Sequence, residues 1–287
     1  MAKSARDLLL IWLTKRIAPE GAVWFAEKCA ALQEDRAFNL AFALAPRKLG
    51  KQDLALSPAE LADADACHER WCPDDWTIDQ AARMVLLLSD QAEDVFKRRV
   101  HQISVTGDVS ELVTLYAGLP IYPFSKSLTD RAAEGLRSNI KAVFEAVAHG
   151  NPFPADHFED GPWNQMVIKA LFIGSRLHPI LSLDRRANED LTRILIDYMH
   201  ERLAAGRTIT PELWRCVGPY FHLVSDADLE RVRTTDDTLE QQGLALALAK
   251  TADPRARELL AKLPNLVEAI DSRKLTWSSI HESISLS

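Results

Sequence analysis

The sequence contains no long apolar run. The first apolar stretch, residues 8–13, ends at Thr14-Lys15-Arg16, so it is shorter than the core of a signal peptide and far too short to cross a bilayer. No later stretch reaches the roughly eighteen uncharged apolar residues that a spanning helix needs. We therefore expect a cytoplasmic protein with no membrane span.

Cysteine is scarce as well. Four cysteines in 287 residues are too few for a disulfide scaffold. Cys67 and Cys72 enclose His68 and Glu69, but no second Cys/His pair stands at zinc-finger spacing, and structural zinc takes four ligands. We therefore assign no metal site, and the sequence identifies no cofactor.

An excess of positive charge and the common catalytic motifs are also missing. Lysine and arginine number 34 against 41 acidic residues, which gives a net charge of -7. This argues against a nucleic-acid partner, because phosphate contacts need a concentrated positive surface. The sequence has no Gly-rich phosphate loop, no Gly-x-Ser-x-Gly elbow and no His-Glu-x-x-His. It therefore leaves open whether the chain is an enzyme.

Helix-start signals are abundant. Five potential capping boxes, in which Ser, Thr or Asp is followed three residues later by an acid or amide, precede apolar runs. They begin at Ser4, Ser57, Thr77, Asp108 and Ser225. Sustained alternation of β-branched and polar residues is absent, so no segment reads as a strand. These patterns predict an all-α protein.

The spacing of the helix starts predicts an irregular stack of antiparallel helical hairpins, of the HEAT/ARM-like right-handed α-α superhelix type. Residues 239–263 fit such a repeat best, with an Ala/Leu-rich helix, a Thr-Ala-Asp-Pro turn and a second helix. Three proline-containing stretches, 46–51, 119–124 and 150–154, are predicted to be loops, because proline is excluded from helix interiors. We expect a single all-helical domain over residues 1–287.

Polar residues on apolar helix faces are the main functional signal. Asn139, Asn164 and Asn188 each fall among apolar neighbours when their segments are read as helices. The helix that follows Asn188 has two apolar faces, and Asp197 lies in the middle of its remaining sector. An unpaired buried amide or carboxylate costs roughly a few kcal/mol. These groups therefore either form a structural network, with Asp197 paired to an arginine such as Arg193, or line a cavity that also includes Lys169.

Several stretches resemble the EboA family. The most specific are Asn-Pro-Phe-Pro-Ala at residues 151–155 and Trp-Asn-Gln-Met-Val-Ile-Lys-Ala-Leu-Phe at residues 163–172, followed by residues 183–188, 197–202 and 205–207. The resemblance extends over residues 1–218. Residues 219–287 match only loosely and are expected to form a HEAT-like helical extension packed on the preceding part.

This resemblance implies a role in the biosynthesis or export of a small secondary metabolite, with no settled reaction. The chain would bind a polar or prenylated intermediate in a helical pocket. The alternative is a non-catalytic HEAT-like scaffold that assembles the other proteins of the Ebo gene cluster. The expected partners are accordingly a small-molecule metabolite or those proteins. Adding polar residues from the stretches that carry the resemblance, the ligand-binding candidates are Arg137, Asn139, Asn164, Lys169, Asp184, Asn188, Asp197 and His200.

Overall fold

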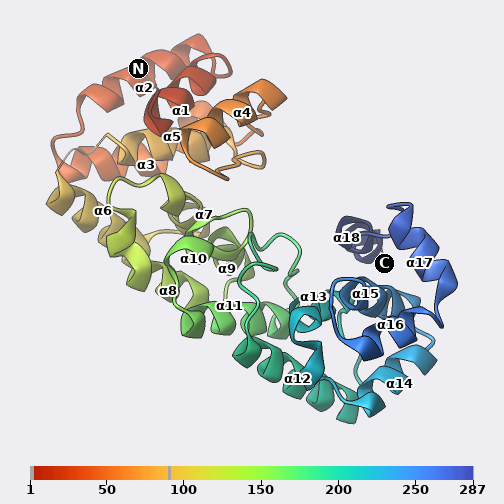
Figure 1. Ribbon diagram of the computed structural model, residues 1–287. Coiled ribbons are helices and arrows are strands. Elements are labelled where there is room, and N and C mark those ends of the chain that lie inside the picture. Colours follow the sequence, from red (N-terminus) through yellow and green to blue (C-terminus); the bar gives the residue numbers. More distant parts are fainter. Residues whose placement is uncertain (1–2, 90–91, 287) are drawn as a thin grey trace. The chain divides into compact units, whose positions relative to one another are not determined.

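The computed structural model describes the backbone of residues 3–89 and 92–286 (Figure 1). Within these residues every regular element is a helix, and an isolated antiparallel bridge between Asp53 and Thr77 is the only pairing of extended backbone. The prediction of an all-α protein is confirmed. In this part of the chain no helix has the length and apolar character needed to cross a bilayer.

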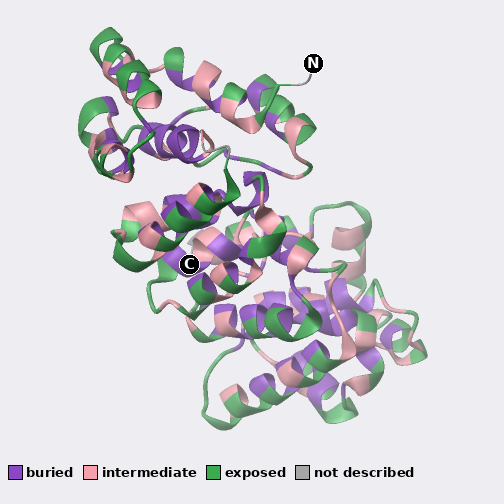
Figure 2. Cartoon of the chain, turned by 90° about the vertical axis from the view of Figure 1, so that its left-hand side faces the viewer, coloured by how far each residue is buried: buried purple, intermediate pink, exposed green. Residues whose placement is uncertain are grey.

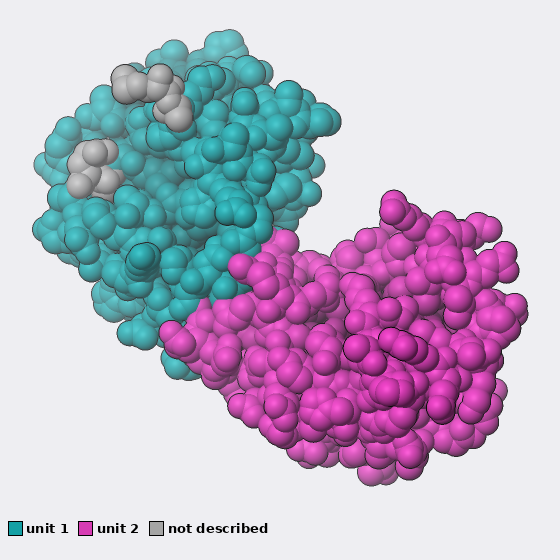
Figure 3. All heavy atoms as spheres, in the orientation of Figure 1, with its two compact units in different colours: residues 1–157 teal, residues 158–287 magenta. Residues whose placement is uncertain are grey.

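The chain divides into two compact units, residues 1–157 and residues 158–287 (Figure 3). The division falls inside the stretch that resembles the EboA family and not at residue 218. This division does not test whether residues 1–287 form a single domain or whether the helices form a HEAT/ARM-like superhelix. Both statements stay predictions. The two units are described separately below.

Unit 1 is a set of short helices connected by tight turns. Figure 2 shows that most helices bury one side and expose the other. The helices are α1 (Ala5–Thr14), α2 (Pro19–Ala30), α3 (Asp35–Leu49), α4 (Pro58–Cys67), α5 (Ile78–Leu87), α6 (Glu93–Thr106), α7 (Val109–Ala117), α8 (Thr129–Arg137), α9 (Lys141–Ala148) and α10 (Phe153–His157), with 3-10 turns η1 (Leu119–Ile121) and η2 (Ser125–Leu128).

Unit 2 is also helical throughout its described residues. Its elements are α11 (Asp160–Phe172), α12 (Glu189–Ala204), η3 (Pro211–Leu213), α13 (Trp214–Val217), η4 (Gly218–Leu223), α14 (Asp226–Thr234), α15 (Thr238–Leu248), α16 (Pro254–Leu260), α17 (Pro264–Asp271) and α18 (Trp277–Leu286). Helices α15 and α16 with the turn between them confirm the helix-turn-helix predicted for residues 239–263. The Asp253 side chain caps α16 by accepting the Arg255 amide at 2.9 Å.

The five predicted capping boxes are all present, at Ser4, Ser57, Thr77, Asp108 and Ser225. In four of them the side-chain oxygen of the first residue accepts a hydrogen bond from the backbone amide three residues later. The side chain of that later residue accepts a hydrogen bond from the first residue's amide in return. At Thr77 the clearest bond is the return one, from the Thr77 amide to the Gln80 side chain at 2.8 Å. Local side-chain chemistry thus sets where these helices begin.

Helix α5 is the centre of unit 1. From Ile78 to Leu87 every residue except Gln80 is buried, and α1, α3 and α7 pack against this helix. Two of the buried residues are charged, Asp79 at 4 % exposure and Arg83 at 1 %. A buried charge needs a partner and further hydrogen bonds to offset its lost hydration, so the contacts of Arg83 decide whether this core is stable.

Arg83 has a partner for most of its donors. Its Nη1 donates to Asp79 Oδ2 at 3.1 Å and to Ser110 Oγ at 3.0 Å, and its Nε donates to the backbone carbonyl of Phe42 at 3.1 Å. The guanidinium also lies over the Phe42 ring, 5.3 Å from its centroid. One side chain thereby joins α5 to α3 and α7.

The bond from Arg83 explains why α3 continues through a proline. Pro46 has no N–H, so the carbonyl four residues earlier, that of Phe42, loses its helical donor. Arg83 Nε replaces that donor. The prediction that residues 46–51 form a loop is therefore wrong for residues 46–49, because α3 extends to Leu49, and right for Gly50 and Lys51, which follow the helix.

The predicted loop over residues 150–154 is wrong in its second half, where α10 begins at Phe153. Asn151 Oδ1 accepts the Phe153 amide at 3.0 Å, and Pro154 lies in the first turn, where its missing N–H removes no helical bond. Residues 119–124 form the 3-10 turn η1 and then leave the helical conformation.

Helices α11 and α12 run parallel. Near their starts the side chains of Asn164 and Asn188 bond to each other, and near their ends Phe172 meets Tyr198 with ring centroids 5.2 Å apart. The connection over residues 173–188 returns the chain to the starting end. The prediction of antiparallel hairpins therefore fails for this pair, which brings two helix C-terminal ends together.

Arg83→Met should lower the free energy of unfolding by about 3–5 kcal/mol, because it leaves the buried Asp79 carboxylate without its cation and the Phe42 carbonyl without a donor. Adding Pro46→Ala should restore about 1 kcal/mol, since the new amide can serve that carbonyl. Chemical denaturation of the single and double variants tests both expectations. Arg98→Met is the control, because Arg98 pairs with Asp35 at the surface and should cost under about 1 kcal/mol. Equal losses for the two single variants would contradict the role given to Arg83.

Candidate functional site

Asn139 lies outside any helix. Helix α8 ends at Arg137, and Ser138 Oγ accepts the Ile140 amide at 3.1 Å. Such a local bond from a serine hydroxyl competes with helix continuation. Asn139 and Arg137 are both exposed. The prediction that Asn139 sits on a buried helix face is therefore wrong, and both residues belong to unit 1, whereas the other candidates belong to unit 2.

Asn164 and Asn188 form a reciprocal amide pair. Asn164 Nδ2 donates to Asn188 Oδ1 at 3.1 Å, and Asn188 Nδ2 donates to Asn164 Oδ1 at 2.8 Å. Asn188 precedes α12 and is its N-cap, with Oδ1 also accepting the Leu191 amide at 2.8 Å, so it does not lie on the face of that helix as predicted. Two half-satisfied amides thus complete each other between two helix starts, which favours the structural-network alternative for this pair.

Helix α12 is buried on two sides, as its two apolar faces predicted, with Leu195 and Tyr198 on one and Met199 on the other. Its remaining sector is exposed to solvent and contains Asp197 and His200. The expected inward position of Asp197 is therefore wrong, and so is its expected pairing.

The arginine expected to pair with Asp197 is engaged elsewhere. Arg193 bonds to Glu189 and Asp190 within its own helix. His200 Nε2 lies 2.8 Å from Asp228 Oδ1 and links α12 to the capping box of α14. Both candidates of α12 are therefore solvent-exposed.

Asp184 and Lys169 occupy different surroundings. Asp184 is exposed and receives both Nε and Nη2 of Arg215, at 2.5 and 3.2 Å, with Lys250 Nζ at 3.7 Å. Lys169 is half-buried on α11, and this burial lowers the pKa of its ammonium group. The structure thus joins Asn164 to Asn188 and does not gather the other candidates around one site.

A buried carboxylate holds the connection between α11 and α12. Glu212 is 2 % exposed. Its Oε2 accepts the Leu177 amide at 2.8 Å, and its Oε1 lies 3.4 Å from His281 Nδ1 and 3.8 Å from Arg176 Nε. Arg176 also donates to the His281 carbonyl at 2.8 Å. Both carboxylate oxygens are therefore engaged, and the cluster serves to fix the backbone of the connection and to dock α18.

His178 stacks on His281 within this cluster, with ring centroids 4.6 Å apart. Its Nδ1 lies 3.4 Å from Arg215 Nη1. Burial lowers the pKa of His178, and the neighbouring His281, Arg215 and Arg176 lower it further, while Glu212 raises it. The imidazole is therefore kept neutral in the folded protein at pH values where a free histidine is already protonated.

A hollow of about 260 Å³ lies where α11 and α12 end, lined by Phe172, Tyr198, Glu201, Arg202 and Arg207. Phe172 is the last residue of α11 and is 66 % exposed. It stands edge to face on Tyr198, at an angle of 81° between the rings. The hollow thus combines an aromatic wall with three charged groups.

Both helices end in the same glycine-dependent turn beside this hollow. Gly174 and Gly206 have φ angles of +64° and +67°, and each donates its amide to the carbonyl three residues earlier. The next amides, of Ser175 and Arg207, donate to the carbonyls of Ala170 and Arg202 at 2.8 and 2.9 Å. This pattern is the Schellman motif, which reverses the chain direction after a helix. It returns Arg207 to the side of Arg202.

The charged groups of the hollow differ in how they are engaged. Arg202 donates Nε and Nη2 to the carbonyl of Thr208, at 3.1 and 2.9 Å. The guanidinium of Arg207 and the carboxylate of Glu201 have no side-chain hydrogen bond or ion pair to any residue in the described ranges. One cation and one anion therefore remain available to a ligand.

These lining residues were missed by reasoning from the sequence. Glu201, Arg202 and Phe172 appeared only within the stretches that carry the family resemblance. The available signal was the pair of glycines, one after each predicted helix, since Gly at this position marks a Schellman turn. Among residues 3–89 and 92–286, no three His, Cys, Asp or Glu side chains are grouped so that they could hold a metal ion.

Comparison with known families places this geometry in context. The family model described as "Metabolite traffic protein EboA" matches residues 5–218. This chain belongs to the EboA family. The match includes all five residues that line the hollow and ends at Gly218, the first residue of η4. No curated protein and no solved structure matched the chain.

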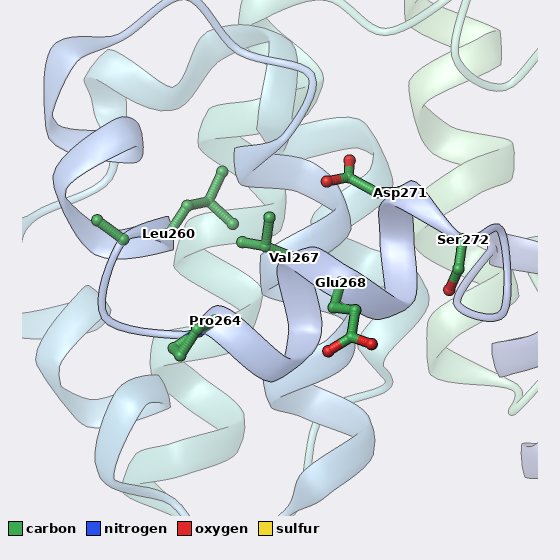
Figure 4. A pocket seen from close by; sticks show the side chains of 7 residues that line it. Leu260, Pro264, Val267, Glu268, Asp271 and Ser272 are labelled. Atoms are coloured by element: carbon green, nitrogen blue, oxygen red, sulfur yellow. The ribbon is translucent and has the colours of Figure 1, made fainter.

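A shallow groove on this EboA-family chain lies outside the matched residues, between α16 and α17 (Figure 4). It measures about 490 Å³ and its lining is mainly apolar, with Leu260 beside Val267. The carboxylates of Glu268 and Asp271 extend on either side of Val267. Neither carboxylate has an ion pair within the part of the chain that the structure describes.

Asn164→Leu should lower the free energy of unfolding by about 1–3 kcal/mol, because it removes both bonds of the amide pair and leaves the Asn188 amide nitrogen poorly satisfied. Asn139→Leu is the matched control, since Asn139 is exposed and outside the helices, and its change should stay within about 0.5 kcal/mol. Denaturant titrations of the two variants provide the comparison. A neutral Asn164→Leu would favour the cavity interpretation of this residue instead.

The stability of the protein should fall as pH decreases below the ordinary pKa of histidine, about 6.5. In this range the unfolded chain binds a proton at residue 178 that the folded protein does not bind, because the pKa of His178 is lowered on folding. His178→Gln should therefore show a smaller loss of melting temperature between pH 7.5 and pH 5 than the unsubstituted protein. Identical pH dependence of the two proteins would contradict this assignment.

Proposed function

We propose that this chain binds a small-molecule metabolite in the hollow at the ends of α11 and α12 and passes it on. The observation that supports the proposal is the exposed ring of Phe172 beside Arg207 and Glu201, two charged groups that no described residue pairs. Phe172 is a large apolar side chain left mostly exposed, and Glu201 and Arg207 are solvent-exposed charges that a ligand can reach. Such a combination is typical of sites where a few polar groups orient a ligand against an apolar wall.

The family description supports the same proposal, since EboA proteins are described as metabolite traffic proteins. The proposal keeps the secondary-metabolite role and the cytoplasmic location expected from the sequence. It requires binding and release and no bond making by the chain.

A hollow in unit 1 is a weaker candidate. It measures about 500 Å³ and includes Arg16 and Asp53 in its lining. Arg16 already bonds to Glu60 at 2.6 Å and lowers the pKa of that carboxyl to about 2. Asp53 Oδ1 accepts the Ala55 amide at 2.9 Å. The charged groups of this hollow are thus committed to the fold.

The alternative function is a scaffold for other Ebo cluster proteins, and the groove between α16 and α17 favours it. An apolar floor at Leu260 and Val267 with the unpaired carboxylates of Glu268 and Asp271 suits a partner helix that carries an apolar stripe beside lysine or arginine. In this interpretation the HEAT-like surface is the functional element. The hollow of α11 and α12 would then hold no ligand.

Phe172→Ala should remove the bound metabolite while leaving stability almost unchanged, because the ring is mostly exposed. The measurement is mass spectrometry of small molecules released from protein purified from cells that carry the whole gene cluster. Val105→Ala, at a position 67 % exposed in unit 1, is the control and should retain the compound. If the same compounds accompany both variants and the unsubstituted protein in equal amount, the proposed site is wrong and the scaffold function gains support.

A further inference from the structure

The aromatic wall of the hollow offers a flat surface. The hydroxyl of Tyr198 is bonded to the carbonyl of Leu171 at 3.4 Å, so this ring is held in place. Phe172 stands on it at 81° and is itself 66 % exposed. Aromatic rings prefer stacked or edge-to-face partners over irregular ones. A planar ring is therefore the ligand part that Phe172 accommodates best.

The volume limits the size of that ring system. Pockets for drug-sized ligands measure roughly 300–1,000 Å³, and this hollow measures about 260 Å³. One or two fused rings with small substituents fit this space. A long prenyl chain does not.

The two unpaired charges specify the substituents. Arg207 can present two parallel N–H donors to an acid group, the arrangement in which guanidinium binds carboxylate most strongly. Glu201 can only accept hydrogen bonds when ionised, so it selects a hydroxyl or amine donor. No ion pair joins Glu201 to Arg207 among the described residues, so the ligand has to engage each group separately.

The parallel arrangement of the helices makes the acid group depend on Arg207. The C-terminal ends of α11 and α12 both lie beside the hollow, and each helix end carries partial negative charge. The negative potential of the two helix ends favours a hydrogen-bond donor of the ligand next to Glu201 and disfavours an acid group of the ligand. Arg202 offsets it only in part, since its Nε and Nη2 are bonded to the Thr208 carbonyl.

From these observations we infer that the ligand is a compact planar ring compound that carries an acid group bound by Arg207 and a hydrogen-bond donor bound by Glu201. This inference rests on the proposed function, because it names the ligand class for the same hollow. Phe172 supplies the stacking surface, and no covalent step is involved.

A matched series of fluorescent probes tests the inference. The full probe is 6-hydroxy-2-naphthoate, with 2-naphthoate lacking the donor, 2-naphthol lacking the acid, and trans-4-hydroxycyclohexanecarboxylate lacking the planar ring. Dissociation constants are measured near neutral pH by fluorescence titration, and by ligand-observed NMR for the non-fluorescent compound. The proteins are the full chain, Arg207→Met, Glu201→Met and Phe172→Ala, all at exposed or rim positions.

The full probe should bind about tenfold or more tightly than either naphthalene that lacks one group, as expected for the loss of one charge-assisted hydrogen bond. Arg207→Met should weaken the two acid naphthalenes by a similar factor and leave 2-naphthol unchanged. Glu201→Met should weaken the two hydroxyl-bearing naphthalenes and leave 2-naphthoate unchanged. The cyclohexane compound should bind more weakly than the full probe, because it lacks the planar ring. Phe172→Ala should weaken all three naphthalenes.

Three results would overturn the inference: equal binding of the acid and neutral naphthalenes, equal weakening of all probes by Arg207→Met, or no measurable binding of any naphthalene. If the metabolite purified with the protein still depends on Phe172, the proposed binding function stands and only the ligand class is wrong. If that metabolite does not depend on Phe172, both the ligand class and the binding site are wrong.

Discussion

The last carbonyl groups of every α-helix lack an intrahelical donor, and a chain made of many short helices carries many such groups. The loops and 3-10 turns between the helices, and the interior of α3 at Pro46, leave further carbonyls without a regular donor. In this protein arginine side chains donate to several carbonyls of these kinds. A guanidinium has five N–H groups in a fixed planar fork, so one side chain can serve a carbonyl and a carboxylate together. The clearest pairs of arginine and carbonyl are Arg16 with Trp12 and Ala55, Arg83 with Phe42, Arg99 with Leu32, Arg186 with Phe158, Arg202 with Thr208 and Arg255 with Val224 and Phe221.

Helix α3 shows how much depends on this interaction. Phe38 and Phe42 lie one turn apart on it with ring centroids 5.5 Å apart. The guanidinium of Arg99 lies 4.2 Å from the centroid of the Phe38 ring, and that of Arg83 lies 5.3 Å from the centroid of the Phe42 ring. Both arginines are 1 % exposed, and they come from α6 and α5. The core of unit 1 is therefore mostly apolar, but two buried guanidinium groups join α5 and α6 to α3.

The sequence predicted the features that depend on neighbouring residues. All five capping boxes were recognisable because their partners are three residues apart, and the two-sided burial of α12 followed from its periodicity. The course of α3 through Pro46 was not predictable, because the compensating donor, Arg83, lies far along the chain. The break at Ser138 was missed because its hydroxyl bond to the Ile140 amide defeats an otherwise helical pattern. The candidate hollow depends on the parallel pairing of α11 and α12, a tertiary contact that sequence periodicity does not predict. Of the predicted candidates, Asn164 and Asn188 bond to each other.

The limit of the family match and the limit of the fold are different. The match ends at residue 218, but α15 packs against η3, α13 and η4, and a side chain on Gly243 of α15 would approach the Pro211 carbonyl to 2.6 Å. Thus residues beyond 218 cover the part of unit 2 that the family defines. A chain that ended at residue 218 would leave η3 and α13 without the helix that covers them, so the boundary of the matched sequence cannot serve as the boundary of an excised domain.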